Sequence, residues 1–155
     1  MIQETSPPRA YFPFPEGVWQ GPIPVPDLDS EPYWAGLREH EIRLLRCQNC
    51  GHWVHYPLAA CPRCHGMELA PERIAGTGSL YSFTISHRDF VPGVPPPYAV
   101  ALVEIDEEPG VRMLSNLVNC YADEIEIGMR VRAVFKDVDE AATLVFFEPD
   151  RGERG

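Results

Sequence analysis

The chain has 155 residues, of which 45% are hydrophobic and 23% charged, as expected for one globular domain or one domain with a small satellite. Thirteen basic against 23 acidic residues give a formal net charge of −10, with a single lysine at Lys136. Proteins that bind nucleic acid by neutralising phosphates need a basic surface, so the charge argues against a nucleic-acid partner. No apolar run approaches the ~18 residues of a membrane helix, and the first residues carry no secretory pattern. We therefore expect a cytoplasmic protein without a membrane partner.

Residues 1–28 are predicted to form an extended arm. Seven prolines fall within this segment, and proline fixes φ and removes a backbone donor, which excludes a helix or a central strand. The segment is also rich in aromatic side chains, which plain disordered tails lack. We interpret it as an arm that docks on a partner or on the protein's own barrel; a floppy terminus is the alternative. The arm residues expected to face a partner are Tyr11, Phe12, Phe14 and Trp19.

A short helix is predicted after the arm. Residues 30–32 read Ser-Glu-Pro, which combines an N-cap candidate, an acidic residue and a first-turn proline. Over residues 33–39, Tyr33, Trp34 and Leu37 are spaced to share one helix face. We count Tyr33 and Trp34 among the residues expected to face a partner.

Two Cys-x-x-Cys pairs in residues 42–66 are the strongest signal in the chain. Each pair brings two sulfurs to one side of a tight turn, and two such turns supply a closed tetrahedral set of four thiolates. This set suits structural zinc, and rubredoxin-type iron uses the same ligands. The metal would supply folding free energy that a piece of ~25 residues cannot obtain from a core of its own. Disulfides would need a secretory context. The predicted ligands are Cys47, Cys50, Cys61 and Cys64.

Residues 71–149 read as a succession of short strands separated by turns. Five antiparallel strands of this length suit a small OB-type barrel, which would also remove exposed strand edges. A small β-sandwich is the competing architecture. Residues 150–155 are expected to form a tail. The predicted strands, identified by apolar alternation or apolar runs, span residues 81–86, 98–105, 111–118, 129–136 and 143–147.

No catalytic constellation is visible in the sequence. The segment Gly76–Ser79 is glycine-rich like a phosphate loop, but it precedes a strand and lacks the lysine, so we interpret it as the entry to the first barrel strand. The sequence contains no Gly-x-Ser-x-Gly nucleophile elbow and no Cys/His pair at a position typical of a catalytic dyad. Acidic residues cluster in predicted turns, including residues 107–110, where we interpret them as solvated. Cys120 is expected to be a small, half-buried residue at a strand end. We assign no catalytic residue.

The order of these segments carries a resemblance. The segment LLRCQNCGHWVHYPLAACPRCHG precedes GTGSLYSFTISH, PYAVALVEID and IGMRVRAVF. This arrangement resembles the acyl-CoA-associated zinc-ribbon/OB-fold family, long known as domain of unknown function thirty-five. The resemblance covers residues 28–148 and leaves the arm outside. It implies a mainly β fold, in which a rubredoxin-like zinc ribbon with a short N-terminal helix, residues 29–70, is followed by a five-stranded OB-fold barrel, residues 71–149.

Members of that family pair with thiolase-superfamily proteins, which hold the catalytic residues. The resemblance therefore implies a non-catalytic accessory subunit of a thiolase, lipid-transfer-protein-like aldolase or acyltransferase that acts on acyl-CoA thioesters. Such a subunit would support the partner's fold and border its active-site entrance. The loop residues expected near acyl-CoA or the partner are His87, Arg88, Phe90 and Tyr98. A proline-stiffened connector is the other reading of this loop.

Three alternatives to the accessory subunit stay open at this point. One is a stand-alone acyl-CoA-binding or channelling module. Another is an OB-fold nucleic-acid binder, against which the acidic charge argues. The last is an independent hydrolase or transferase, which lacks a visible nucleophile.

Overall fold

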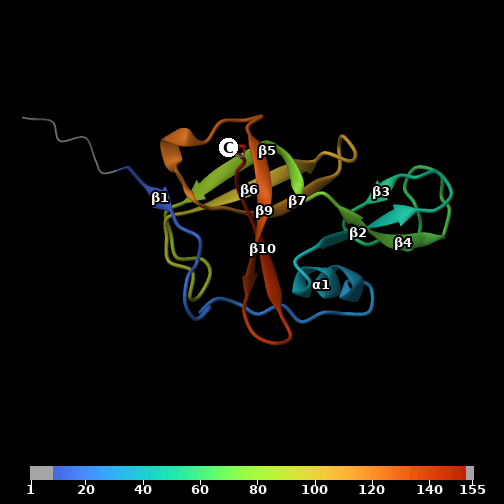
Figure 1. Cartoon of the computed structure of the whole chain (residues 1–155), viewed down its shortest axis with the longest axis horizontal. Helices are drawn as coiled ribbons and strands as arrows, with labels where there is room; N and C mark the ends of the chain where they lie inside the picture. The colour runs from blue at the N-terminus through green and yellow to red at the C-terminus, as the bar shows by residue number, and fades with distance from the viewer. Residues whose placement is uncertain (1–8, 153–155) are drawn as a thin grey trace, which may run out of the picture.

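The computed structural model describes residues 9–152; residues 1–8 of the predicted arm and residues 153–155 of the predicted tail lie outside the described residues. The fold is mainly β, as predicted (Figure 1). A three-stranded ribbon sheet lies beyond one end of a closed five-stranded barrel. The elements are β1 (Tyr11–Phe12), α1 (Glu31–Arg38), β2 (Ile42–Cys47), β3 (Trp53–Val54), β4 (Leu69–Ile74), β5 (Thr77–Ser86), β6 (Tyr98–Ile105), β7 (Arg112–Leu117), β8 (Cys120–Tyr121), the 3-10 turn η1 (Ala122–Glu124), β9 (Arg130–Asp137) and β10 (Thr143–Pro149).

The barrel closes in the order β10-β7-β6-β5-β9, which confirms the five predicted strands and excludes the sandwich. Four of its junctions are antiparallel, and a parallel pairing of β10 with β7 at Phe147 and Leu117 closes the ring. A register shift between Leu80 and Ser82 marks a bulge, which bends β5 so that its first residues also pair with β9. Closure leaves these strands without a free edge.

Strand β6 shows how the sequence fills the barrel. Every second residue of β6 is buried, and Ala99, Ala101 and Val103 are among these inward positions. Small side chains at such positions leave room for larger ones, and Met113 and Phe147 are fully buried in the same core. Gly78 lies against β6 so closely that a Cβ would overlap the carbonyl oxygen of Glu104. The glycine-rich segment therefore serves strand entry, as predicted.

The ribbon sheet has the order β3-β2-β4. Strand β4 crosses residue 71, where the sequence predicts the start of the barrel, and it pairs along its whole length with β2. Its sequence, LAPERI, shows no apolar alternation, which is why no strand was expected there. Pro71 is compatible with β4 because β4 is an edge strand, where a missing backbone donor is tolerated.

Helix α1 begins two residues before the predicted start and packs against β2 and β10, and its Leu37 is fully buried in the hydrophobic core. Ser30 does not cap the helix with its side chain, contrary to the expectation. Its hydroxyl donates instead to Asp27 Oδ1 at 2.6 Å, and the carbonyl oxygen of Asp27 accepts from Glu31 N. The arm therefore ends in its own hydrogen-bonded turn just before the helix. The described residues contain no helix long and apolar enough to cross a membrane.

The described part of the arm lies on the protein's own barrel, running from β1 at one end of the molecule to α1 beside the ribbon (Figure 1). Strand β1 pairs with β8, and the ring centroids of Phe14 and Trp19 each lie 6.1 Å from that of Phe146. This outcome is one of the two docked arrangements expected from the prolines and aromatics. Phe12 is 3% exposed and belongs to the hydrophobic core, so its assignment as a partner-facing residue is wrong.

Candidate functional site

The four predicted cysteines come together at one end of the ribbon. Their four sulfur atoms all lie within 4.8 Å of one another. Cys47 Sγ is 3.5 Å from Cys64 Sγ, and Cys50 Sγ is 3.6 Å from Cys61 Sγ, so each short contact joins one Cys-x-x-Cys pair to the other. A compact set of four thiolates fits a single tetrahedral metal ion, zinc or iron. The bound metal would cross-link the two turns.

The surroundings of two of the sulfurs, those of Cys61 and Cys64, favour the thiolate form that a metal needs. Backbone N–H groups of Arg63 and Gly66 donate to the Sγ atoms of Cys61 and Cys64, each at 3.4 Å. The side-chain amide of Asn49 also donates to Cys64 at 3.5 Å. The hydrogen bonds from Asn49 and Gly66 lower the pKa of Cys64 to about 6, because they stabilise the anion. The residues present therefore fit a bound metal.

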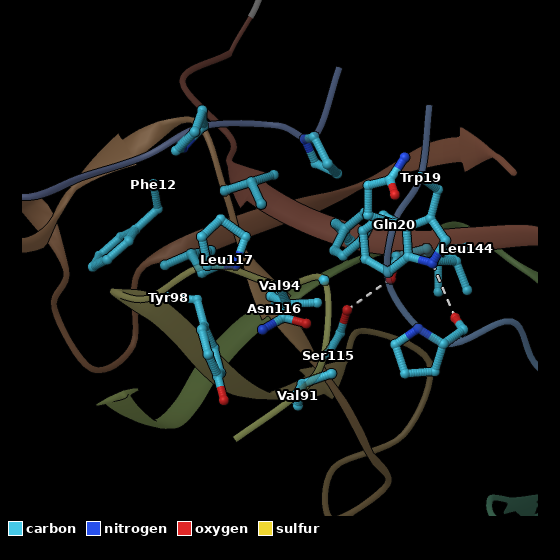
Figure 2. Close-up of a pocket in the computed structure, with 18 of the residues that line it drawn as sticks. Phe12, Trp19, Gln20, Val91, Val94, Tyr98, Ser115, Asn116, Leu117 and Leu144 are labelled. Carbon is cyan, nitrogen blue, oxygen red and sulfur yellow. Dashed lines mark hydrogen bonds between the residues drawn. The ribbon is translucent and has the colours of Figure 1, made fainter. Parts of the chain in front are cut away.

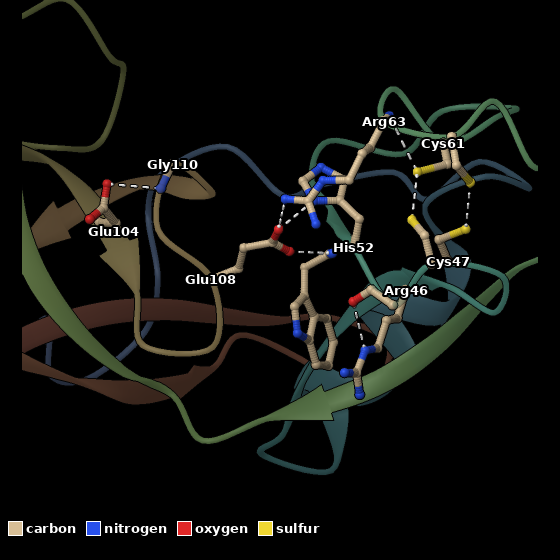
Figure 3. A network of polar contacts seen from close by, with 12 residues as sticks. Arg46, Cys47, His52, Cys61, Arg63, Glu104, Glu108 and Gly110 are labelled. Atoms are coloured by element: carbon tan, nitrogen blue, oxygen red, sulfur yellow. Dashed lines mark hydrogen bonds and ion pairs between the residues drawn. The ribbon is translucent and has the colours of Figure 1, made fainter.

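A carboxylate from the barrel holds the ribbon in place (Figure 3). Glu108 lies in the turn between β6 and β7, and its Oε1 is 2.5 Å from both His52 Nδ1 and Arg63 Nη2. Its Oε2 accepts from the backbone N–H of Trp53 at 2.6 Å. Because His52 follows the first cysteine pair and Arg63 lies inside the second, one side chain joins the barrel to both metal-binding turns. We call this network the Glu108 clamp.

The neighbouring turn residues extend this polar junction. Glu107 Oε1 accepts from the backbone N–H of Ala75, at the link between the ribbon and the barrel. Asp106 accepts from Arg130 and from the hydroxyl of Thr77. The expectation that acidic residues 107–110 are simply solvated is therefore wrong for the two glutamates. Their partners lie more than 30 residues away in the chain, and no local pattern announces them.

A cavity of about 590 Å³ lies between the arm and strands β7 and β10 of the barrel (Figure 2). We call it the arm cavity. Helix α1 and the loop that precedes β6 complete its wall. The side chains that define it are mainly apolar and come from all of these segments, for example Trp19, Tyr33, Val94, Tyr98, Leu144 and Phe146. A second hollow of about 250 Å³ lies next to it toward the ribbon, and both are lined by Tyr33, Trp34 and Leu114.

Some of the predicted partner-facing and loop residues line the arm cavity, and others lie at the surface. Tyr33, Trp34 and Trp19 line the arm cavity, and so does Tyr98, which lies at the start of β6 rather than in the loop. Phe14 is half-buried beside Phe146. The others stay at the surface of the described structure: the Tyr11 ring contacts that of Tyr121 at a tilt of 59°, and His87, Arg88 and Phe90 are exposed. Sequence reasoning missed Val94 and Leu144, because neither belongs to a motif.

Burial favours the neutral form of three side chains, Tyr33, His55 and Cys120, the first two of which line the hollows. Burial raises the pKa of the Tyr33 hydroxyl above its usual value. Burial also lowers the pKa of His55 to about 4, and the His55 ring lies 5.9 Å from that of Tyr33. Cys120 is fully buried rather than half-buried, and burial raises the pKa of its thiol to about 11. A thiol with that pKa is a poor nucleophile at neutral pH.

Within residues 9–152, no hydroxyl or thiol is hydrogen-bonded to a histidine. The arrangement most similar to such a nucleophile–histidine pair consists of Thr143, Asp137 and His40. Asp137 Oδ1 lies 2.9 Å from the threonine hydroxyl and 2.8 Å from His40 Nε2. The carboxylate stands between the hydroxyl and the imidazole, so the histidine is not placed to take the hydroxyl proton. His40 also stacks on Phe135, so this group connects the end of α1 to β9.

The fold and the cysteine site together define a metal-binding ribbon joined to an OB barrel. Two family models match these parts: the ChsH2 rubredoxin-like zinc ribbon domain over residues 34–70, and the ChsH2 C-terminal OB-fold domain over residues 72–136. A DUF35 domain-containing scaffold protein of Methanocaldococcus jannaschii is 32% identical over 69% of this chain and 77% of its own length. The chain belongs to the DUF35 family of zinc-ribbon/OB-fold proteins, which confirms the resemblance.

Two further similarities concern larger assemblies. A chain of the solved structure described as "Ltp2-ChsH2(DUF35) aldolase" is 34% identical, with a TM-score of 0.74 over 81% of this chain and 98% of that chain. A probable enoyl-CoA hydratase alpha subunit of Thermomonospora curvata is 34% identical over 83% of this chain. This chain spans only 40% of the length of that hydratase subunit.

Proposed function

We propose that this protein is a non-catalytic subunit of a thiolase-like enzyme that acts on an acyl-CoA thioester. The observation that carries the proposal is the similarity to the DUF35 chain of an Ltp2 aldolase structure, which extends over nearly all of that chain. The scaffold description of the archaeal relative supports the same role. The partner would hold the catalytic groups, and this chain would support its fold and border its active-site entrance.

The chemistry of the described residues is consistent with a subunit that has no catalytic group of its own. The imidazoles of His40 and His52 are each committed to a carboxylate. The thiol of Cys120 is buried and protonated. The four remaining cysteines form the ribbon site, where we propose a structural zinc. A bound zinc would cross-link the two turns and stabilise the ribbon, and the closed set of four sulfurs leaves no position for a substrate.

The charge distribution on the barrel supports a protein partner rather than a nucleic acid. Arg130 pairs with Asp106, and Arg132 pairs with Glu148. Lys136 donates to the carbonyl oxygen of Gly17 in the arm. The one local group of basic side chains on the barrel is therefore neutralised or engaged within the chain, and the overall charge is −10. Such a surface repels a phosphate backbone.

The second half of the arm is the proposed partner-facing segment, in place of Phe12. Ile23, Val25 and Leu28 alternate with prolines or precede the helix, and Val25 and Leu28 are 90% and 96% exposed. Exposed apolar side chains on a proline-restricted backbone lose little conformational entropy on docking. The exposed Phe90 in the loop before β6 is a further proposed contact.

The test is assembly with each thiolase-superfamily protein of the same organism. We expect the full chain to co-purify with one of them and to raise its solubility or its activity on an acyl-CoA substrate. Val25→Asp together with Leu28→Asp should weaken the complex at least tenfold and leave the metal content unchanged. Ile127→Asp, at an apolar side chain that is 63% exposed and lies outside the arm and the cavity lining, is the matched control. Failure of every candidate partner to co-elute would overturn the proposal.

A stand-alone acyl-CoA-binding module is the second candidate, and the arm cavity is the observation that favours it. A free binding module and a subunit make different predictions for the isolated chain. A free module should bind acyl-CoA with full affinity on its own, whereas a subunit should gain affinity for the complete thioester when the partner is present.

A further inference from the structure

The arm cavity is built by contacts that keep the arm away from the barrel surface between its anchor points. At one end, Asn119 N donates to the carbonyl oxygen of Phe12 at 2.6 Å, and Phe14 N donates to Asn119 Oδ1 at 3.1 Å. Farther along, Lys136 Nζ donates to the carbonyl oxygen of Gly17 at 2.6 Å. These bonds fix the arm's path, so the space beneath it is not closed by simple collapse.

The loop before β6 forms the facing rim of the cavity. Gly93 has a φ of +80°, which favours glycine, and a Cβ there would overlap the carbonyl oxygen of Gln20 in the arm. The loop and the arm therefore meet backbone against backbone at this point. From the same loop, Val94 points its side chain toward the hollow (Figure 2).

The lining of the cavity selects against charge. Among the described residues that line it, Glu16 carries the one formal charge, and none is basic. Three of its polar side chains already have partners. Ser115 Oγ donates to the carbonyl oxygen of Val145, and Asn116 Nδ2 donates to that of Ala99. Trp19 Nε1 donates to the carbonyl oxygen of Pro22 (Figure 2). The remaining surface offers aromatic and aliphatic faces.

The size of the cavity matches a small molecule. Ligand pockets commonly measure about 300–1,000 Å³ and are lined by apolar and aromatic side chains with a few polar groups. The arm cavity, at about 590 Å³, falls inside this range. A phosphate or carboxylate would find no cation in the lining, whereas a hydrocarbon chain or ring would contact Trp19 and Phe146.

We propose that the arm cavity binds the uncharged, apolar end of an acyl thioester, with the proline-rich arm as one wall of the binding site. The identification of the ligand as a thioester rests on the proposed function; the apolar, uncharged character rests on the lining. The charged phosphates of the CoA portion stay outside the cavity. The first half of the arm thus serves ligand binding, and the exposed second half serves the partner.

The first experiment uses the isolated full chain and the neutral fluorescent probe N-phenyl-1-naphthylamine. We expect saturable binding, with quenching or energy transfer from Trp19 and Trp34, which line the cavity. Octanoyl-CoA should displace the probe, whereas CoA should not. Between butanoyl-CoA and octanoyl-CoA the apparent affinity should rise on the order of threefold per methylene, as expected for burial of hydrocarbon. Equal displacement by CoA and octanoyl-CoA would overturn the proposal.

The second experiment places the ligand in this cavity rather than elsewhere. Val94→Trp should fill the space and weaken probe binding at least tenfold. Phe90→Trp is the matched control, because it adds the same ring to the same loop at an exposed position outside the lining, and it should bind the probe like the wild type. Circular dichroism and metal content should be unchanged in both variants. Equal probe affinity in the two variants would overturn the proposal.

Assembly with the thiolase-like partner is measured in parallel on the same proteins. Probe binding without assembly would support the cavity and contradict the proposed function. Assembly of Val94→Trp together with its loss of probe binding would support both. Assembly of the wild type with no saturable probe binding, alone or in the complex, would overturn the cavity proposal and leave the proposed function standing.

Discussion

The ribbon and the arm both contribute apolar side chains to the barrel's core, but their other contacts with the barrel differ. The ribbon is joined to it by directional polar contacts, in which Glu108 alone engages Arg63, His52 and the backbone of Trp53. The arm is anchored at a few points by strand pairing and hydrogen bonds, and between these points it faces the barrel through apolar side chains around Phe146, with a cavity of about 590 Å³ beneath it. Hydrogen bonds and ion pairs require one geometry, whereas apolar contact tolerates unfilled space. The first junction therefore fixes an orientation, and the second leaves room for a ligand.

The polar junction is also the more sensitive to loss of a single group. The Glu108 side chain is 12% exposed. Burial alone would raise its pKa, but the hydrogen bonds from Trp53 N and His52 and the charge of Arg63 lower the pKa overall. Removing one member of such a network leaves buried polar groups without partners, which costs more than the network's net contribution. The apolar junction has no equivalent single point of failure outside Phe12.

The largest expected effect is the loss of ribbon structure when the metal site is disrupted, because the polar junction needs a folded ribbon. Cys61→Ser removes one of four sulfur ligands, so the metal content should fall to near zero and residues 42–66 should lose their protection from hydrogen exchange. The barrel should stay folded, because its core is separate from the sulfur cluster. Cys120→Ser is the control: it replaces a cysteine outside the cluster and should retain one metal per chain. Full metal content in Cys61→Ser would contradict the four-cysteine site.

The next effect concerns the anchored end of the arm. Phe12→Ala empties a fully buried position and should lower the free energy of unfolding by about 3–5 kcal/mol. Phe90→Ala, at a side chain that is 71% exposed, should change it by less than about 0.5 kcal/mol. Urea unfolding measures both. Similar small changes would mean that Phe12 does not belong to the core, and that the arm is attached more loosely than the structure shows.

Removing the Glu108 clamp should cost nearly as much stability as Phe12→Ala. Glu108→Ala should destabilise the protein by about 2–4 kcal/mol, because it leaves Arg63, His52 and the Trp53 N–H without their shared acceptor. Hydrogen exchange should rise in residues 52–63 and in the turn between β6 and β7 together. Glu140→Ala, at an exposed turn position, provides the baseline. An increase confined to the turn would show that the clamp does not couple the ribbon to the barrel.

The smallest effect is a pH dependence at the barrel end of the same turn. The hydrogen bonds and charge of Arg130 lower the pKa of Asp106 to about 2. A carboxyl with a depressed folded pKa contributes stability above its unfolded pKa of about 4 and loses it as the pH falls toward 2. The wild type should therefore be slightly more stable than Asp106→Asn at pH 6, by less than about 1 kcal/mol because the pair is partly exposed.

The difference between these two proteins should vanish near pH 2. Comparing the urea midpoints of the pair at each pH cancels the acid sensitivity of the metal site, which both proteins share. A difference that stays constant from pH 6 to pH 2 would mean that ionised Asp106 contributes nothing to stability.

Features that depend on residues close together in the chain could be predicted from the sequence, whereas contacts between distant residues could not. The cysteine pairs and the strand alternation are local patterns, and the structure confirms the cysteine cluster and all five barrel strands. The Glu108 clamp joins residues 45 to 56 positions apart, and Glu-Glu-Pro-Gly looks like an ordinary solvated turn. The prolines and aromatics of the arm favoured docking over a floppy terminus, but they do not distinguish the protein's own barrel from a partner. Strand β4 was missed because its partner, β2, determines it more than its own residues do.

The most direct test of the subunit account compares the isolated chain with its complex in one acyl-CoA assay. The chain alone should turn over no acyl-CoA substrate, because its described histidines and its buried thiol are not arranged as a nucleophile with a base. The complex with a thiolase-like protein should show activity that the partner alone lacks or shows only weakly. Acyl-CoA turnover by the isolated chain that survives repurification, with no gain on adding any thiolase-like partner, would contradict the account.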